Sequence, residues 1–127
     1  MIAGVGADMV RVERMEKSLA SEAFWQRVFG AEERAFLEKL SPARKAASAA
    51  ANFAAKEAFL KACGKGLGGF ALAEIQVLRE KSGAPYYALR GAAAAHLAEK
   101  GLHAALSLSH EAVSYTHLRA HETAANL

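Results

Sequence analysis

The sequence predicts a single-domain α+β protein, in which an antiparallel sheet packs against a long central helix and several short helices. Its 127 residues are a typical length for one domain, and they contain no linker-like segment and no internal repeat. A strand-like segment at the N-terminus is followed by helical patterns, and then by strand-like segments separated by turns. One α+β domain is the natural architecture for this order of elements.

The first forty residues indicate one strand and three short helices. Residues 2–8 form the strand, and its two glycines indicate a bulge or the close approach of another group. A helix is predicted from about Met9, where apolar residues recur at helical spacing. Ser21 is placed to cap a second helix, and residues 31–40 form the third.

The longest predicted helix begins after Ser41 and runs to about Cys63. Ser41-Pro42 joins a capping hydroxyl to a proline at the first helical position. Gly64 follows the helix and accepts the left-handed conformation that closes it. Cys63 is the single cysteine, so no internal disulfide can form, and a small apolar filler is a better interpretation than a nucleophile.

The second half of the chain alternates strands with turns and adds one further helix. The predicted elements are strands at 72–79 and 85–89 around a Ser82-Gly83 turn, an alanine-rich helix at 92–100, and a strand at 103–109. These strands are expected to build the antiparallel sheet.

Composition and charge narrow the functional classes only in part. No apolar run approaches the ~18 residues of a membrane span and no signal peptide is visible, so a cytoplasmic protein without a membrane partner is expected. A net charge of +3 favours anionic partners, namely phosphates, nucleic acid or acidic proteins, without choosing among them.

Two segments carry candidate chemistry. Asp8 follows small residues that leave room for a ligand, although an aspartate at this position could equally cap the first helix. Glu57 and Lys61 share one helix face, where they could form an exposed ion pair. The surrounding alanines and phenylalanines predict a largely buried helix instead, in which charges are costly unless they are paired or bind a metal. An acid, a lysine one turn later and a glycine-rich loop suit phosphate and magnesium. The spacings of the P-loop and of the dinucleotide fingerprint are both missing.

Two segments resemble the signatures of the holo-acyl-carrier-protein synthases, the short trimeric type of 4′-phosphopantetheinyl transferase. The first is Gly4-Val5-Gly6-Ala7-Asp8 with Arg14-Met15, and the second is Phe53-Ala54-Ala55-Lys56-Glu57-Ala58 with Lys61-Ala62 and Gly64-Lys65-Gly66. The Gly83-Ala84-Pro85 turn also agrees, and the similarity covers about residues 1–111. It implies the fold of that family and, for fatty acid biosynthesis, transfer of 4′-phosphopantetheine from coenzyme A to a serine of apo-acyl carrier protein. Holo-acyl carrier protein and adenosine 3′,5′-bisphosphate would be the products.

The resemblance also implies the residues of the site. Asp8 and Glu57 are the expected ligands of Mg²⁺, and Lys61 is expected to neutralise charge on the pyrophosphate as it breaks. These three are the predicted catalytic residues, with Glu57, or a water that it orients, as the base. Contacts to coenzyme A are predicted from Lys56, Lys61, Gly64, Gly66, Pro85, Ser109 and His110.

The predicted partners are coenzyme A, an acidic acyl carrier protein and two further copies of the chain. Arg11, Arg14 and Lys17 recur every three residues, either as an ordinary solvated face or as a basic ridge for the carrier protein. The resemblance implies a homotrimer with active sites at subunit interfaces. Nucleic acid is not an expected partner, because the aromatic residues fall mostly on apolar helix faces.

The chain departs from the family pattern in its tail, at Asn52, and at Lys65, where relatives often carry threonine. Residues 112–127 are polar and histidine-rich, so an atypical tail replaces the expected last strand of the 1–111 domain, although residues 113–118 could still pair through their backbone. Asn52 stands where relatives often carry arginine, and the loss of one phosphate contact is expected. These departures keep an alternative open, a catalytically impaired module that binds coenzyme A or an acidic protein.

Overall fold

The computed structural model of the chain describes residues 1–66, 68–109 and 113–120. Its elements are β1 (Ile2–Met9), α1 (Val12–Leu19), α2 (Glu22–Val28), α3 (Ala31–Glu38), α4 (Pro42–Ala62), the 3₁₀ turn η1 (Leu72–Glu74), β2 (Ile75–Arg79), β3 (Pro85–Leu89), α5 (Gly91–Lys100), β4 (Leu102–Leu108) and β5 (Val113–Ala120). The predicted α+β domain is confirmed.

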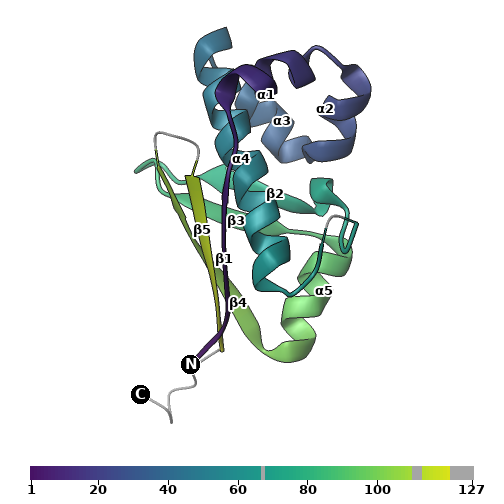
Figure 1. Cartoon of the computed structure of the whole chain (residues 1–127), viewed down its shortest axis with the longest axis vertical. Coiled ribbons are helices and arrows are strands. Elements are labelled where there is room, and N and C mark those ends of the chain that lie inside the picture. Colours follow the sequence, from purple (N-terminus) through teal and green to yellow (C-terminus); the bar gives the residue numbers. More distant parts are fainter. Residues whose placement is uncertain (67, 110–112, 121–127) are drawn as a thin grey trace.

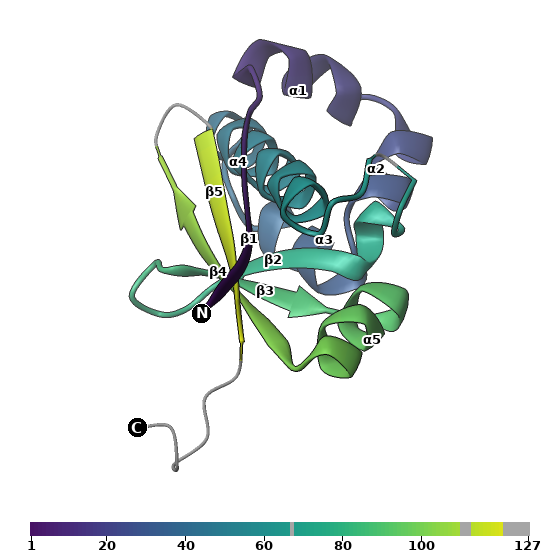
Figure 2. The same cartoon turned by 60° about the horizontal axis from the view of Figure 1, so that its bottom comes forward.

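The strands form two antiparallel sheets, one in the order β1-β5-β4 and one that pairs β2 with β3. The long helix α4 contacts strands of both sheets, whereas α1, α2 and α3 gather at one end of the molecule and α5 lies at the other (Figure 1). A second view shows α1 and α5 at opposite ends of the molecule (Figure 2). The helix α4 is therefore the element on which both halves of the fold are assembled.

Two glycines let β1 approach the backbone of α4 closely. A Cβ atom at Gly4 would lie 2.2 Å from the Ala62 carbonyl oxygen, and one at Gly6 would lie 2.1 Å from that of Ala58. Because side chains alternate along a strand, Asp8 lies on the same face of β1 as these glycines. The close approach predicted from the glycines is confirmed, and it brings Asp8 to the C-terminal half of α4.

The ends of α4 follow from local chemistry. Pro42 occupies the first turn, where its missing N–H costs nothing. Gly64 has a positive φ of 72°, its N–H donates to the Lys61 carbonyl, and the Lys65 N–H donates to the Leu60 carbonyl at 2.8 Å. This pair of bonds is a Schellman cap. The predicted cap by the Ser41 hydroxyl is wrong, because that side chain makes no capping hydrogen bond.

Two element boundaries in the structure differ from those predicted from the sequence. The helix expected from Met9 begins at Val12, because β1 continues through Met9 to pair with β5. Residues 72–74, expected as the start of a strand, form the turn η1. There the carboxylate of Glu74 accepts a hydrogen bond from the Ala92 N–H at 2.8 Å and so caps α5.

The atypical C-terminal segment contributes the central strand of the three-stranded sheet. Along β5, Thr116 and Leu118 are buried while His117 and Arg119 are exposed, as strand alternation requires. The expectation that residues 113–118 pair through their backbone is confirmed. No helix in the described part of the chain is both long and apolar enough to cross a bilayer.

Candidate active site

The predicted catalytic residues Asp8, Glu57 and Lys61 meet where the end of β1 crosses α4. The Lys61 ammonium donates to Asp8 Oδ1 at 2.8 Å and to the carbonyl of Ala7 at 3.1 Å. Of the two side chains, that of Lys61 is 55% exposed and that of Asp8 is 16% exposed. Residues separated by about fifty positions in the chain therefore form one charged cluster.

In this cluster the carboxyl group of Asp8 disfavours the charged form of Glu57. Partial burial raises the pKa of Glu57, the neighbouring Asp8 charge and a side-chain hydrogen bond with Asp8 raise it further, and Lys61 lowers it in part. The pKa of Lys61 is raised, chiefly by its hydrogen bond to Asp8. One ammonium thus serves two carboxyl groups, which leaves the cluster with excess negative charge.

The two non-functional interpretations, a helix cap formed by Asp8 and an ion pair between Glu57 and Lys61, do not fit this geometry. Asp8 does not cap α1, whose N-cap residue is Arg11 and which lacks a side-chain cap. Lys61 forms its ion pair with Asp8 rather than with Glu57.

A cleft of about 540 Å³ opens beside the carboxyl groups. Asp8 and Glu57 line it together with Phe53 and with Arg11 and Arg14 from the start of α1. A polar edge and an aromatic wall suit an anionic organic ligand.

The predicted basic ridge borders this cleft. Arg11, Arg14 and Lys17 are all exposed, and together with Glu13 they line a shallower hollow next to it. A protein docked on the ridge would consequently sit next to the carboxyl groups.

The cluster could accept a hard divalent cation. Within the described ranges no group of three or more His, Cys, Asp or Glu side chains is arranged to hold a metal. Magnesium is usually bound by one or two protein carboxylates, and substrate phosphates and water complete its coordination. A site with only two carboxylates fits this pattern. A cation here would also relieve the repulsion between Asp8 and Glu57.

A second hollow, of about 500 Å³, gathers Pro85 and Ser109, two of the predicted contacts for coenzyme A. Arg79, Ser48 and Ala51 also line it, and it shares no lining residue with the first cleft. At 100° per residue, Ser48 lies on the opposite side of α4 from Glu57. One chain therefore presents its carboxyl cluster and this hollow on different faces.

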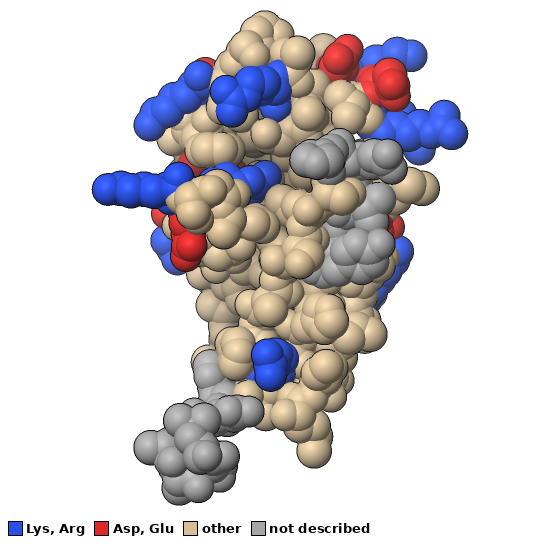
Figure 3. All heavy atoms as spheres, turned by 90° about the vertical axis from the view of Figure 1, so that its left-hand side faces the viewer, with Lys and Arg blue, Asp and Glu red and all other residues tan. Residues whose placement is uncertain are grey.

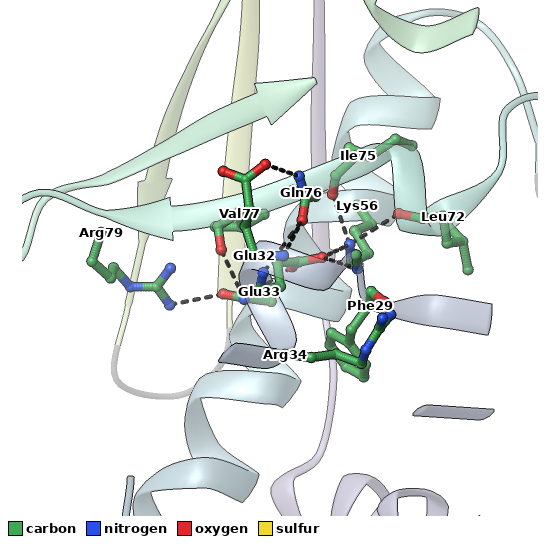
Figure 4. Close-up of polar contacts among 12 residues, drawn as sticks. Phe29, Glu32, Glu33, Arg34, Lys56, Leu72, Ile75, Gln76, Val77 and Arg79 are labelled. Atoms are coloured by element: carbon green, nitrogen blue, oxygen red, sulfur yellow. Dashed lines mark hydrogen bonds and ion pairs between the residues drawn. The ribbon is translucent and has the colours of Figure 1, made fainter. Parts of the chain in front are cut away.

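The predicted contact of Lys56 with coenzyme A is not supported and needs correction. Lys56 is completely buried, and its ammonium donates to Glu33 Oε1 at 2.6 Å and to the carbonyls of Leu72 and Ile75 (Figure 4). Burial lowers its pKa to about 8, against the opposing effect of Glu33. Lys56 is therefore a structural residue, whose three donors are directed to protein acceptors.

Asn52 belongs to the same buried network. Its amide nitrogen donates to Glu33 Oε2 and to the Val77 carbonyl, both at 3.1 Å, and its oxygen accepts from Arg79 at 2.8 Å. Sequence reasoning missed Glu33 and Arg79, because the contacts that join them to Lys56 and Asn52 are made between separate elements.

Three of the predicted contacts for coenzyme A remain, namely Gly64, Gly66 and His110. Gly64 and Gly66 are exposed at the end of α4, with open space where a side chain would stand, so their role toward phosphates stays a prediction. His110 lies outside the described residues.

The fold and the charged cluster together define a known family. A model of the 4′-phosphopantetheinyl transferase superfamily matches residues 4–116, and the chain belongs to that family. It is 46% identical over 115 residues to a holo-[acyl-carrier-protein] synthase of Treponema denticola, which covers 87% of this chain and 90% of the relative. It is also 41% identical over 114 residues to a holo-[acyl-carrier-protein] synthase of Paramagnetospirillum magneticum, with 86% of each chain covered.

A solved structure agrees with this assignment. The holo-(acyl-carrier-protein) synthase of Bacillus anthracis, in complex with CoA (3′,5′-ADP), superimposes with a TM-score of 0.80 at 30% identity and covers 95% of this chain and 99% of its own. The family predicted from the two signature segments is confirmed.

Proposed function

We propose that this protein transfers 4′-phosphopantetheine from coenzyme A to a serine hydroxyl of apo-acyl carrier protein. The observation that carries the proposal is the cluster of Asp8, Glu57 and Lys61, assembled from β1 and α4 beside an open cleft. The family match over residues 4–116 includes every residue of this cluster.

The reaction requires the cluster to accept a proton and to stabilise a growing negative charge. The serine oxygen forms a bond to the phosphorus that carries pantetheine, while the bond from that phosphorus to the bridging oxygen breaks and adenosine 3′,5′-bisphosphate leaves. Glu57 is placed to accept the serine proton, and its raised pKa makes it a better base than an ordinary carboxylate. Lys61, exposed and fixed by Asp8, supplies positive charge to the leaving phosphate.

Asp8 and Glu57 would also hold the cofactor, Mg²⁺. When bound, the ion supplies charge neutralisation on the pyrophosphate. The protein contributes the two carboxylates and the fixed distance between β1 and α4 on which their spacing depends.

The carrier protein would dock on the basic ridge of Arg11, Arg14 and Lys17. Carrier proteins of this class are acidic, and the ridge adjoins the cleft. Arg14→Glu should raise the KM for carrier protein about tenfold or more at low salt and weaken its salt dependence, because the charge that steers encounter is reversed. Arg27→Glu, on the exposed side of α2, is the matched control, and an unchanged KM in Arg14→Glu would remove the ridge from the site.

A homotrimer with active sites between subunits accounts for two further features. The strand β1 exposes large apolar side chains, with Ile2 at 56%, Val5 at 60% and Met9 at 70%. The sheet side of the molecule is largely uncharged, while lysines and arginines gather towards the helical end (Figure 3). Packing copies through this face would bring the carboxyl cluster of one chain towards the second hollow of another. Light scattering at three times the 13.5 kDa mass of one chain would support the trimer, and a monomer would exclude it.

The division at residue 111 and the cytoplasmic location remain predictions from the sequence. The tail proposed from residue 112 onward includes β5, whose backbone completes the sheet. We propose that the tail permits the fold while replacing the usual side chains.

The activity is tested by mass spectrometry of apo-acyl carrier protein incubated with the protein, coenzyme A and Mg²⁺. One added phosphopantetheine per carrier, abolished by chelator and by Glu57→Gln, is the expected result. Glu99→Gln, which removes an exposed carboxylate from α5, should leave the rate unchanged. If the carrier mass does not change while coenzyme A still binds, the transferase proposal fails and the binding-module alternative takes its place.

A further inference from the structure

Two hydroxyl groups connect both sheets to the long helix. The phenol of Tyr87, on β3, donates a hydrogen bond to the carbonyl of Ala55 in α4 at 2.6 Å. The hydroxyl oxygen of Thr116, on β5, lies 2.5 Å from the same phenol oxygen. Because β3 and β5 belong to different sheets, this one contact joins a strand of each sheet to the backbone of α4.

The direction of these two hydrogen bonds follows from their chemistry. A carbonyl oxygen can only accept, so the single phenol hydrogen of Tyr87 is used for Ala55. Thr116 therefore donates its own hydrogen to the phenol oxygen. Burial raises the pKa of Tyr87 above its usual value, so the phenol keeps its hydrogen. The hydrogen bonds run in one direction, from β5 through β3 to α4.

Both side chains are fixed by their surroundings. Thr116 is completely buried. The ring of Tyr87 packs edge-on against that of Phe59, with centroids 5.2 Å apart and an angle of 61° between the ring planes. Phe59 is completely buried as well, and it lies one helical turn after Ala55. The two hydrogen bonds consequently hold β5 at a set distance from α4.

Thr116 is the neighbour of the glycine that brings β1 onto α4. It is paired with Gly6 in the sheet, and paired residues of antiparallel strands direct their side chains to the same face. That face is turned towards α4, because a Cβ atom at Gly6 would meet the carbonyl oxygen of Ala58. Asp8 lies two residues further along the same face of β1. The distance between β5 and α4 therefore also sets the position of Asp8.

We propose that the hydroxyl groups of Tyr87 and Thr116 hold β1 at the distance from α4 on which the geometry of the carboxyl cluster depends. Both are positioning residues, because neither lines the cleft beside Asp8 and Glu57. The inference rests on the proposed function, which assigns the divalent cation to these two carboxylates. Thr116 belongs to the atypical segment 112–127, so the resemblance to the family does not imply this contact.

Thr116→Val changes the spacing without leaving a buried donor unpaired. Tyr87 still donates to Ala55 in this variant, so the fold should persist. The hydrogen bond spans 2.5 Å, whereas a methyl carbon needs about 3.5 Å from an oxygen atom, so β5 has to move about 1 Å from the phenol. Thr116→Ser keeps the donor and should keep the spacing.

Two further variants complete the set. Tyr87→Phe removes both hydrogen bonds and deprives the buried Thr116 hydroxyl of its acceptor. Tyr86→Phe is the matched control, because it removes the same group from the adjacent residue of β3, whose side chain is 41% exposed.

Two measurements separate positioning from stability. The affinity for Mn²⁺, which accepts the same oxygen ligands as Mg²⁺, is measured by electron paramagnetic resonance of the free ion with adenosine 3′,5′-bisphosphate present. Transfer kinetics give kcat and the KM for carrier protein. Both are measured at a temperature at which thermal unfolding shows that each variant is folded.

Thr116→Val and Tyr87→Phe should each weaken Mn²⁺ binding about tenfold and lower kcat by a similar factor, as is usual when the support of a metal ligand is lost. The KM for carrier protein should stay unchanged, because the basic ridge lies outside β1 and β5. Thr116→Ser and Tyr86→Phe should behave as the wild type. A purely structural role would lower the Tm and leave the Mn²⁺ affinity of the folded protein unchanged.

Three outcomes would overturn the inference: wild-type Mn²⁺ affinity in either Thr116→Val or Tyr87→Phe, an equal loss in Thr116→Ser, or no Mn²⁺ binding by the wild type. The fate of the proposed function is read separately. Mn²⁺ affinity that depends on both hydroxyl groups, without any transfer by the wild type, would support this inference while the transferase proposal fails. Transfer with a Mn²⁺ affinity that depends on neither hydroxyl group would do the reverse.

Discussion

Lys56 and Glu57 are neighbours in α4, yet their charged groups lie in opposite environments, one in the protein interior and one at a cleft. The ammonium of Lys56 is fully enclosed and directs its three donors to Glu33 and two backbone carbonyls. The carboxyl of Glu57 faces a cleft, where Asp8 opposes its charge and one exposed lysine compensates two acids. Adjacent residues on a helix point about 100° apart, so one step along α4 separates the interior from the site.

The difference shows how a structural charge can be told from a functional one. A structural charge is satisfied by the protein alone, because an unpaired buried charge would cost several kcal/mol, roughly the net stability of a domain. The pair of Asp8 and Glu57 is left short of positive charge, and an external cation or a phosphate-bound metal would complete it. The two regions therefore predict opposite responses to the loss of one side chain.

Lys56→Met should have the largest effect, a loss of about 3–5 kcal/mol of unfolding free energy, because Glu33 is left buried without its cation. Urea denaturation measures it, with Lys39→Met as the exposed control at the end of α3. Glu33→Leu combined with Lys56→Met should recover part of the loss, since no lone charge then remains. A loss below about 1 kcal/mol in Lys56→Met would contradict the structural role of this lysine.

Gly6→Ala should cost about 1–3 kcal/mol, because the added methyl group would stand 2.1 Å from the Ala58 carbonyl oxygen. It should also reduce transfer, since β1 and Asp8 must shift away from Glu57. Gly66→Ala is the matched control for stability, because its Cβ would meet open space. If Gly6→Ala is as stable as this control and as active as the wild type, close packing of β1 on α4 does not set the geometry of the site.

Much of this arrangement could be predicted from local sequence. Pro42 and Gly64 mark the ends of α4 through backbone rules that need no tertiary information. The glycines of β1 predicted a close neighbour, and the resemblance to the family brought Asp8 and Glu57 together. Each of these signals is carried by residues a few positions apart or by a motif.

The rest depends on contacts between distant elements. The burial of Lys56 could not be predicted, because its partner Glu33 lies 23 positions away and no motif joins them. Alternation along β2 would expose Gln76, yet its side chain is buried because it accepts hydrogen bonds from the N–H groups of Glu32 and Glu33 at the start of α3. The partners of such residues are fixed only once the chain is folded.

Glu57→Gln should have the smallest effect on stability, and in the opposite direction. Because the pKa of Glu57 is raised on folding, the native state holds its proton after the unfolded state has released it. The protein therefore loses stability as pH rises from the ordinary carboxyl pKa through the raised one. In chelator, Glu57→Gln should match the wild type at low pH and exceed it at neutral pH, as measured by thermal unfolding. A variant less stable than the wild type at neutral pH would show that the two carboxyl groups do not repel.

The central claim is that Asp8 and Glu57 share one divalent cation, and metal-linked thermal stability with coenzyme A present tests it most directly. The measurement is the rise in Tm when Mg²⁺ replaces chelator, for the wild type, Asp8→Asn and Glu57→Gln, because a ligand that binds the native state raises its stability. The wild type should gain stability, and both variants should lose that gain. If either variant retains the full rise in Tm, the two carboxylates do not hold a common ion.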